Sequence, residues 1–212
     1  MVRSKQQKDI FLESEADAWF ERNQEAVARQ DFARDPICRA LLELVGSALG
    51  QPSLSILEVG CGSGLRLQWL AEHLGARVAG IEPSGKGVAE ACARGVDARR
   101  GTAEALPWGD ASFDVVLFGF CLYLCDPTDL FRIAAEADRV LKPRSWLVLH
   151  DFFAAGHVRR LYHHNPAVMS SKMDYRRLFD WHPAYTCYAH RLVAHGERGF
   201  SDDPQEWSPP RY

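Results

Sequence analysis

The chain lacks the features of a secreted, membrane-spanning or nucleic-acid-binding protein. Its six cysteines are scattered without a C-x-x-C pair, which excludes a small disulfide-rich module and favours a reducing compartment. No apolar run approaches the roughly 20 residues that a membrane-spanning helix needs. The polar N-terminus, residues 1–8, has no signal-peptide character. The net charge is −3 and the arginine pairs are isolated, so no basic surface for a nucleic acid is indicated.

The length and composition suit one sizeable domain. A chain of 212 residues with 47% hydrophobic content is typical of a globular protein, and at this length folding buries roughly 70% of the unfolded surface. Cys121 and Cys125 stand four residues apart, but zinc needs further ligands nearby, so no metal is expected. We expect a soluble, cytoplasmic protein.

What the chain does have is an apolar run, residues 54–59, that stops abruptly in a glycine-rich turn, residues 60–64. Such a run predicts a buried parallel strand, and the apolar residues after the turn recur at helical spacing. Glycines suit a turn in which a ligand lies directly on the main chain. Strand, turn and helix together indicate one half of a nucleotide-binding unit.

The sequence of this turn, E-V-G-C-G-S-G at residues 58–64, resembles the first motif of the class I S-adenosylmethionine-dependent methyltransferases. Its third glycine comes one residue earlier than in the dinucleotide fingerprint G-x-G-x-x-G, although a nicotinamide dehydrogenase stays the rival interpretation. The carboxylate at the end of the strand would repel a pyrophosphate and could hold a cationic amino group. The resemblance implies S-adenosyl-L-methionine as cofactor, S-adenosyl-L-homocysteine as product, and contacts from Glu58, Gly60, Cys61, Gly62 and Gly64.

A second strand is predicted over residues 77–81, and it ends on Glu82 and Pro83. An acid at the tip of the second strand, about 20 residues beyond the glycine turn, can accept hydrogen bonds from both ribose hydroxyls. Glu82 could instead cap the next helix, but Ser84 is better placed for that role. Glu82 and Pro83 are therefore predicted to bind the cofactor.

Two further landmarks follow. Residues 101–107, G-T-A-E-A-L-P, resemble the family's loop after the third strand, which lies against the adenine; this implies contacts from Thr102, Ala103 and Glu104. Thr102 stands where the family more often has Asp or Asn.

The predicted fourth strand, residues 113–118, leads to Gly119 and Phe120, which the resemblance places beside cofactor and acceptor. The Asp/Asn-Pro-Pro-Tyr/Phe motif of enzymes that methylate nucleic-acid amines is absent at this position.

A helix from Pro127, an L-K-P turn and a fifth strand over residues 146–150 complete a resemblance that covers roughly residues 54–153. His150 and Asp151 at the end of this strand are candidate general bases, and Tyr123 is a candidate for orienting the acceptor. The alternative, that His150 and Asp151 only cap the chain locally, has equal weight.

The predicted fold is α/β, with a doubly wound, mostly parallel seven-stranded sheet of Rossmann-like methyltransferase type and an N-terminal helical cap. We expect residues 1–50 to form the cap and 51–151 the cofactor-binding core. Residues 152–212 should form a helical excursion on the substrate side, with a sixth strand over 184–194 and a short seventh in 201–212. Trp19, on a predicted helix over residues 9–30, is either part of a buried stripe or a cofactor contact from a lid.

The expected function is methyl transfer to an oxygen or nitrogen of a small-molecule acceptor. A methyltransferase acting on protein or RNA, and a non-catalytic S-adenosylmethionine-binding protein, are the alternatives. We expect no nucleic-acid or membrane partner and a monomer or homodimer.

Overall fold

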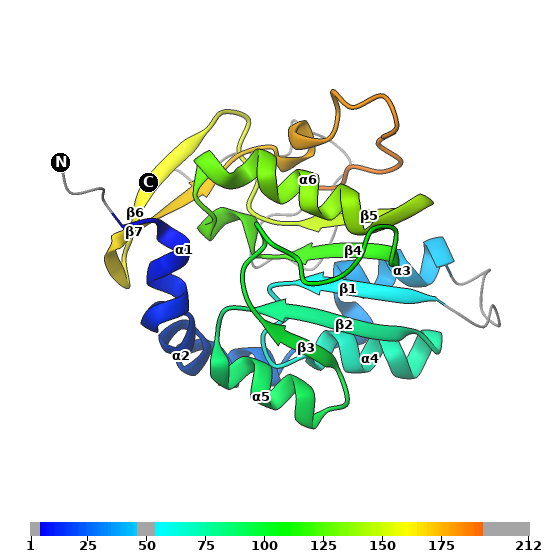
Figure 1. Cartoon of the computed structure of the whole chain (residues 1–212), viewed down its shortest axis with the longest axis horizontal. Helices are drawn as coiled ribbons and strands as arrows, with labels where there is room; N and C mark the ends of the chain where they lie inside the picture. The colour runs from blue at the N-terminus through cyan, green and yellow to red at the C-terminus, as the bar shows by residue number, and fades with distance from the viewer. Residues whose placement is uncertain (1–4, 46–53, 193–212) are drawn as a thin grey trace.

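The computed structural model describes residues 5–45 and 54–192. Its centre is a parallel sheet in the order β3-β2-β1-β4-β5 (Figure 1). The strands are β1 (Ser55–Val59), β2 (Arg77–Glu82), β3 (Asp97–Arg100), β4 (Phe113–Gly119) and β5 (Leu141–His150). The chain winds outward from β1 to β3 and then returns to the other side of β1. The predicted doubly wound arrangement is therefore present, and the order of strands reverses between β1 and β4, where ligands bind in such sheets.

The strand register brings the expected site residues together. Val59 of β1 pairs with Ile81 of β2 on one side and with Phe118 of β4 on the other. The residues one step further along these three strands therefore lie side by side at the carboxyl edge of the sheet: Gly60, Glu82 and Gly119.

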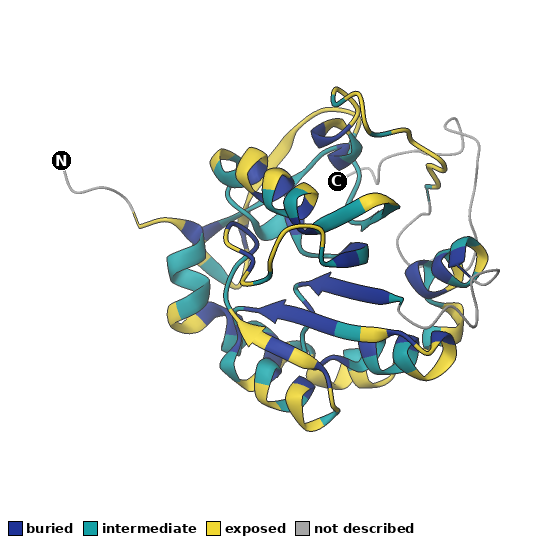
Figure 2. Cartoon of the chain, turned by 45° about the vertical axis from the view of Figure 1, so that its right-hand side comes forward, coloured by how far each residue is buried: buried dark blue, intermediate teal, exposed yellow. Residues whose placement is uncertain are grey.

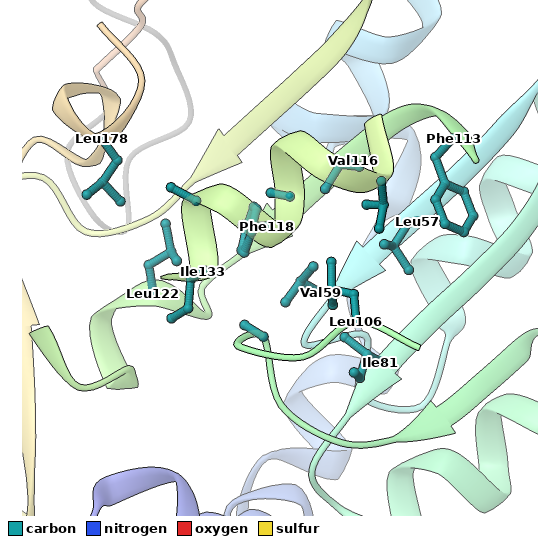
Figure 3. Close-up of a cluster of buried hydrophobic side chains, with 14 of the residues drawn as sticks. Leu57, Val59, Ile81, Leu106, Phe113, Val116, Phe118, Leu122, Ile133 and Leu178 are labelled. Carbon is teal, nitrogen blue, oxygen red and sulfur yellow. The ribbon is translucent and has the colours of Figure 1, made fainter. Parts of the chain in front are cut away.

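Helices cover both faces of the sheet because successive strand residues point to opposite sides. One face packs on α6 (Leu130–Val140) and carries Leu57, Val59 and Phe118 (Figure 3). The other face packs mainly on α3 (Pro36–Val45), α4 (Leu65–Leu74) and α5 (Gly85–Ala93), and it carries Ile56. Every residue of β1 is buried, whereas the edge strand β3 is mostly exposed (Figure 2).

The N-terminal segment forms one continuous helical arm, which confirms the helix predicted over residues 9–30. It consists of α1 (Gln7–Ile10), a π-helical turn η1 (Phe11–Glu15) and α2 (Ala16–Ala28); the short 3₁₀ turn η2 (Phe32–Arg34) then leads to α3. Asp35 caps α3, because its carboxylate accepts a hydrogen bond from the backbone N–H of Cys38 at 3.0 Å.

The prediction of a helical excursion after residue 152 is wrong. The chain there forms an antiparallel hairpin, β6 (Val158–Tyr162) and β7 (Asn165–Lys172), followed by a short 3₁₀ turn η6 (Tyr175–Leu178). Val158, Leu161 and Tyr162 are spaced as on one helix face, yet only Tyr162 is buried. The buried residues of β7, Val168 and Ser171, are three apart and show no strand alternation either, so tertiary packing decides the structure of this segment.

The prediction of seven strands in the sheet is also wrong, since the described residues give it five. Residues 184–191 form no ladder, and residue 192 makes only an isolated bridge. Two aromatic residues of this segment contact the domain through their side chains: Tyr185 donates a hydrogen bond to Asp138 at 2.8 Å, and Tyr188 packs on Trp146. Residues 201–212, where the seventh strand was expected, lie outside the described part of the chain.

Candidate active site

A pocket of about 790 Å³, including the space at its mouth, opens at the carboxyl edge of the sheet. Its wall combines three parts of the chain: the N-terminal arm, the strand ends with their loops, and the segment after β4. The lining residues are Lys8, Phe11, Ala16, Trp19, Val59, Gly60, Ile81, Glu82, Pro83, Gly101, Thr102, Ala103, Glu104, Gly119, Phe120, Cys121, Leu124, Cys125 and Asp126.

The glycine turn is tight because three of its residues adopt positive φ. Gly60, Gly62 and Gly64 have φ of 78°, 53° and 74°. A Cβ on Gly64 would lie 2.9 Å from the Cβ of Ala91, so the turn packs closely on α5. Gly60 lines the pocket, whereas Gly62 and Gly64 serve the turn and the start of α4.

Glu82 lies at the end of β2, in the pocket wall, and its carboxylate also fastens the glycine turn. It accepts hydrogen bonds from the backbone N–H groups of Gly62 at 3.0 Å and Ser84 at 2.9 Å. Burial raises the pKa of Glu82 to about 7, although these two donors favour the charged form. Each oxygen keeps a further lone pair for a ligand hydroxyl.

Glu58 does not meet the pocket, contrary to the expectation that it holds the amino group of a cofactor. Its side chain points to the α3–α4 face of the sheet, where it forms an ion pair with Arg66. Arg66 also pairs with Asp35 at 3.3 Å. The alternation of β1 explains the difference: Val59 and Leu57 face α6, so Glu58 faces the opposite side.

Cys61 is likewise turned away from the pocket. It belongs to the hydrophobic cluster on the α3–α5 face. A Cβ on Gly80 would lie 2.4 Å from its sulfur, so this side chain fills the space that Gly80 leaves open in β2.

The loop after β3 forms one side of the pocket, where the sequence predicts adenine contacts. Thr102, Ala103 and Glu104 all line it. Glu104 is buried, and its Oε2 accepts no hydrogen bond from the described residues. A buried acceptor without a donor costs free energy unless a ligand or water supplies one.

The end of β4 carries a strained aromatic residue. Phe120 lines the pocket with a φ of 53°, a conformation that is uncommon for a bulky residue and costs on the order of 1–3 kcal/mol. Its backbone N–H donates to the carbonyl oxygen of His150 at 2.8 Å. The preceding Gly119 has no room for a Cβ, which would lie 2.5 Å from the Arg66 guanidinium.

The three predicted catalytic residues do not line the pocket. His150 packs its ring 4.5 Å from that of Phe120; burial lowers the pKa of His150, and its Nδ1 has no partner among the described residues. The Asp151 carboxylate accepts hydrogen bonds from the backbone N–H groups of Leu122, Tyr123 and Phe152. Burial raises the pKa of Asp151 to about 7. These bonds give Asp151 the local capping role that the sequence left open.

Trp19 joins the pocket wall to the segment after β4. It lines the pocket, and its indole lies beside the hydroxyl group of Tyr123. Tyr123 packs edge-on against Phe152 with ring centroids 5.0 Å apart. Tyr123 is thus one layer behind the pocket wall.

Sequence reasoning missed several lining residues, notably Lys8 and Phe11 on the arm and Leu124, Cys125 and Asp126 after β4. The helical periodicity of the arm showed that it has an inner face. Only the tertiary structure shows that this face closes the pocket.

Among the described residues, no helix has both the length and the apolar character needed to cross a bilayer. Within the same part of the chain, no three His, Cys, Asp or Glu side chains come together as a metal site.

The pocket lies on the carboxyl edge of a doubly wound sheet, and an acid follows the second strand. Residues 57–149 match the family model described as a methyltransferase domain. This part of the chain is thus similar in sequence to methyltransferase domains, and its doubly wound fold agrees with that match.

Similar proteins include an uncharacterized methyltransferase of Synechocystis, 34% identical over 102 residues, which cover 47% of this chain and 48% of the relative. The ubiquinone biosynthesis O-methyltransferase of Sinorhizobium medicae is 42% identical over 94 residues, covering 42% of this chain and 34% of the relative. The chain therefore spans about a third to a half of the length of these relatives.

Among solved structures, the 1,6-didemethyltoxoflavin-N1-methyltransferase of Burkholderia thailandensis superposes with a TM-score of 0.62 at 18% identity. The superposition covers 80% of this chain and 73% of the other. At this identity the likeness establishes the fold.

Proposed function

We propose that this protein transfers a methyl group from S-adenosyl-L-methionine to an oxygen or nitrogen of a small molecule. The observation that carries the proposal is the Glu82 carboxylate, which fastens the glycine turn and faces a pocket at the point where the strand order reverses. Relatives named as small-molecule O-methyltransferases support it.

The residues present fit this cofactor. Glu82 has free lone pairs for two ribose hydroxyls, and the unpartnered Oε2 of Glu104 can accept a hydrogen bond from the exocyclic amino group of adenine. Ile81 and Phe11 supply apolar surface for the purine ring. Carboxylates outnumber cations in the pocket wall, as suits a positively charged sulfonium.

When bound, S-adenosyl-L-methionine supplies a methyl group that is already electrophilic. The chain's residues have to place the acceptor in line and exclude water, and such positioning contributes roughly 7–11 kcal/mol to catalysis. Trp19 and Phe120 wall the pocket for this purpose. His150, the predicted base, has a lowered pKa and an Nδ1 that is unpartnered among the described residues, but its ring packs on Phe120 and does not line the pocket, so no proton transfer is assigned to it.

The test is to incubate the purified protein with methyl-labelled S-adenosyl-L-methionine and a lysate of its source cell, then to separate the lysate by molecular size. Label is expected in the low-molecular-weight fraction. Glu82→Ala should abolish the labelling, whereas the matched control Glu72→Ala, on the exposed side of α4, should retain it. Label in protein or RNA would replace the small-molecule acceptor by a macromolecular one.

A further inference from the structure

Two cysteines stand together in the pocket wall. Cys121 and Cys125 both line the pocket and are joined by a single 3₁₀ turn, η4 (Leu122–Leu124). The thiol of Cys125 donates to the carbonyl oxygen of Cys121 at 3.5 Å, which places the two cysteines side by side in the wall. Neither forms a disulfide.

The backbone between them holds this arrangement in place. The N–H of Leu124 donates to the Cys121 carbonyl oxygen at 3.2 Å, and the N–H of Cys125 donates to the Leu122 carbonyl oxygen at 3.0 Å. The Asp151 carboxylate accepts hydrogen bonds from the N–H groups of Leu122 and Tyr123, which fixes the start of this turn. The Cys125 sulfur reaches the Cys121 carbonyl oxygen, so the two side chains lie on one side of the turn. A 3₁₀ turn rises about 2.0 Å per residue, more than an α-helix, so a disulfide between residues four apart requires this turn to tighten.

The other described cysteines are placed differently. Cys38 and Cys61 are buried in the hydrophobic cluster on the α3–α5 face, and Cys92 and Cys187 are exposed outside the pocket. A small oxidant that enters the pocket therefore meets two adjacent thiols there.

We propose that Cys121 and Cys125 form a redox-sensitive dithiol, which hydrogen peroxide closes to a disulfide in the pocket wall, and that this closure weakens cofactor binding. The second part rests on the proposed function. In the first step the Cys125 thiolate attacks one peroxide oxygen; the O–O bond breaks, and a sulfenic acid and hydroxide form. The Cys121 thiol then attacks the sulfenic sulfur, so that the S–S bond forms, the S–O bond breaks and water leaves. The two sulfurs lose two electrons and the peroxide gains them.

The order of attack follows from the surroundings of the two thiols. The Cys121 side chain packs against Gly60 of the glycine turn, and the neighbouring Cys125 thiol, together with burial, raises the pKa of Cys121 well above its usual value. Since the thiolate is the nucleophile, Cys121 is suited to the second, resolving step.

Disulfide formation would change the position of Cys121, which lies against the glycine turn. The Cβ and Sγ of Cys121 lie 3.1 and 3.2 Å from the position that a Cβ on Gly60 would occupy. A disulfide draws two sulfurs from noncovalent contact to about 2.05 Å, so the contact between the Cys121 side chain and this turn changes when the bond forms.

The experiment treats the protein with hydrogen peroxide, blocks remaining thiols with iodoacetamide and maps the tryptic peptides by mass. Residues 101–132 contain no internal Lys or Arg and only these two cysteines. This peptide should lose two hydrogen atoms, resist alkylation and regain both thiols on reduction. Cys187→Ser should behave as the parent protein, whereas Cys121→Ser and Cys125→Ser should form no disulfide.

Titration calorimetry then compares S-adenosyl-L-methionine binding before oxidation, after it and after reduction. Oxidation should weaken affinity about tenfold, reversibly, in the parent and in Cys187→Ser only. Two free thiols or sulfinic acids in the peptide would overturn the dithiol, and unchanged affinity in the disulfide form would overturn the effect on binding. Failure of the reduced protein to bind would refute the proposed function and, with it, the effect on binding, while the peptide map still decides whether the disulfide forms.

Discussion

The Glu82 carboxylate serves the protein's own backbone and the pocket at once. It accepts hydrogen bonds from Gly62 and Ser84 and faces the space where a ribose is proposed to lie. Because burial raises the pKa of Glu82 to about 7, a sizeable fraction is protonated at neutral pH before a ligand arrives. Ligand hydroxyls that donate to this carboxylate favour its ionised form.

Affinity for S-adenosyl-L-methionine should therefore rise with pH through about 7. If only the ionised form binds, the dissociation constant increases about tenfold for each pH unit below the pKa and levels off above it. Calorimetry between pH 5.5 and 8.5 measures this, and Glu82→Gln should give a weaker and flatter profile. A parent protein with pH-independent affinity would refute the coupling.

Two glycines with the same backbone conformation differ in what surrounds them. Gly64 and Gly75 have φ of 74° and 64° at the two ends of α4. A Cβ on Gly64 would meet Ala91 at 2.9 Å, whereas one on Gly75 would meet nothing within 4 Å.

Gly64→Ala should lower the free energy of unfolding by about 3 kcal/mol and Gly75→Ala by only about 1 kcal/mol. The left-handed conformation costs about 1–2 kcal/mol in both, and overpacking against α5 adds a similar amount in the first alone. Urea denaturation of both variants gives the difference directly. Equal destabilisation of the two variants would contradict this prediction, because it would show that α5 moves aside for the added methyl group at no cost in free energy.

At this scale the sequence predicts residues whose role is local. The glycine turn and Glu82 are found because strand, turn and acid follow one another in the chain. Glu58 was expected in the pocket, but the alternation of β1 turns its side chain away from the pocket and toward Arg66 on α4. The sequence places Glu58 next to the glycine turn, but its ion pair with Arg66 lies on the face of β1 opposite the one that packs on α6.

Among the elements, the N-terminal arm depends on one buried amide. Gln7 donates from its side chain to the carbonyl oxygens of Leu124 at 2.6 Å and Met169 at 2.9 Å, and it accepts from the N–H of Met169 at 2.8 Å. The side chain thus pairs with β7 as a neighbouring strand would. Arm, hairpin and the segment after β4 are joined at this point.

Gln7→Ala should loosen the arm without unfolding the sheet. It leaves the backbone groups of Leu124 and Met169 without this partner, at a cost of about 2 kcal/mol, so that amide exchange in α1 and α2 should accelerate about 30-fold. Hydrogen-exchange mass spectrometry measures it, and Gln24→Ala on the exposed face of α2 is the control.

Cofactor affinity should also fall in Gln7→Ala, because arm residues such as Phe11 and Trp19 wall the pocket. If amide exchange in the arm stayed as slow as in the parent protein, the Gln7 hydrogen bonds would not be needed to hold the arm in place.

The elements of the core are predictable from apolar periodicity, since each strand and helix carries its own pattern. The hairpin is not, because Val158 and Leu161 are exposed while Val168 and Ser171 are buried by contacts with distant segments. The arm was predicted as a helix, but its place over the pocket follows from Gln7 and its partners.

For the molecule as a whole, one sheet separates two hydrophobic clusters and contributes strand residues to both. Loss of the sheet would expose both clusters together. The pocket lies at the edge of this shared element, so that a ligand bound there is linked to the stability of the entire domain.

S-adenosyl-L-methionine at about 100 times its dissociation constant should stabilise the folded state by about 2.7 kcal/mol. For a chain of this size the melting temperature should then rise by about 5–10 °C. Differential scanning calorimetry gives the shift, with NAD at the same concentration as the comparison. A larger rise with NAD would restore the dehydrogenase interpretation.

The π-helical turn at Phe11–Glu15 sets which way the first residues of the arm face. Such a turn holds one residue more than an α-helical one for about the same rotation about the axis, so deleting a residue there would let it close as an ordinary α-helical turn, with Gln7 still on β7 and Lys8 still at the pocket. Deleting a residue within α2 would instead rotate everything before it by about 100° about the helix axis. The π-helical turn is therefore a place where the arm can change its length by one residue and keep the same side chains at the pocket mouth.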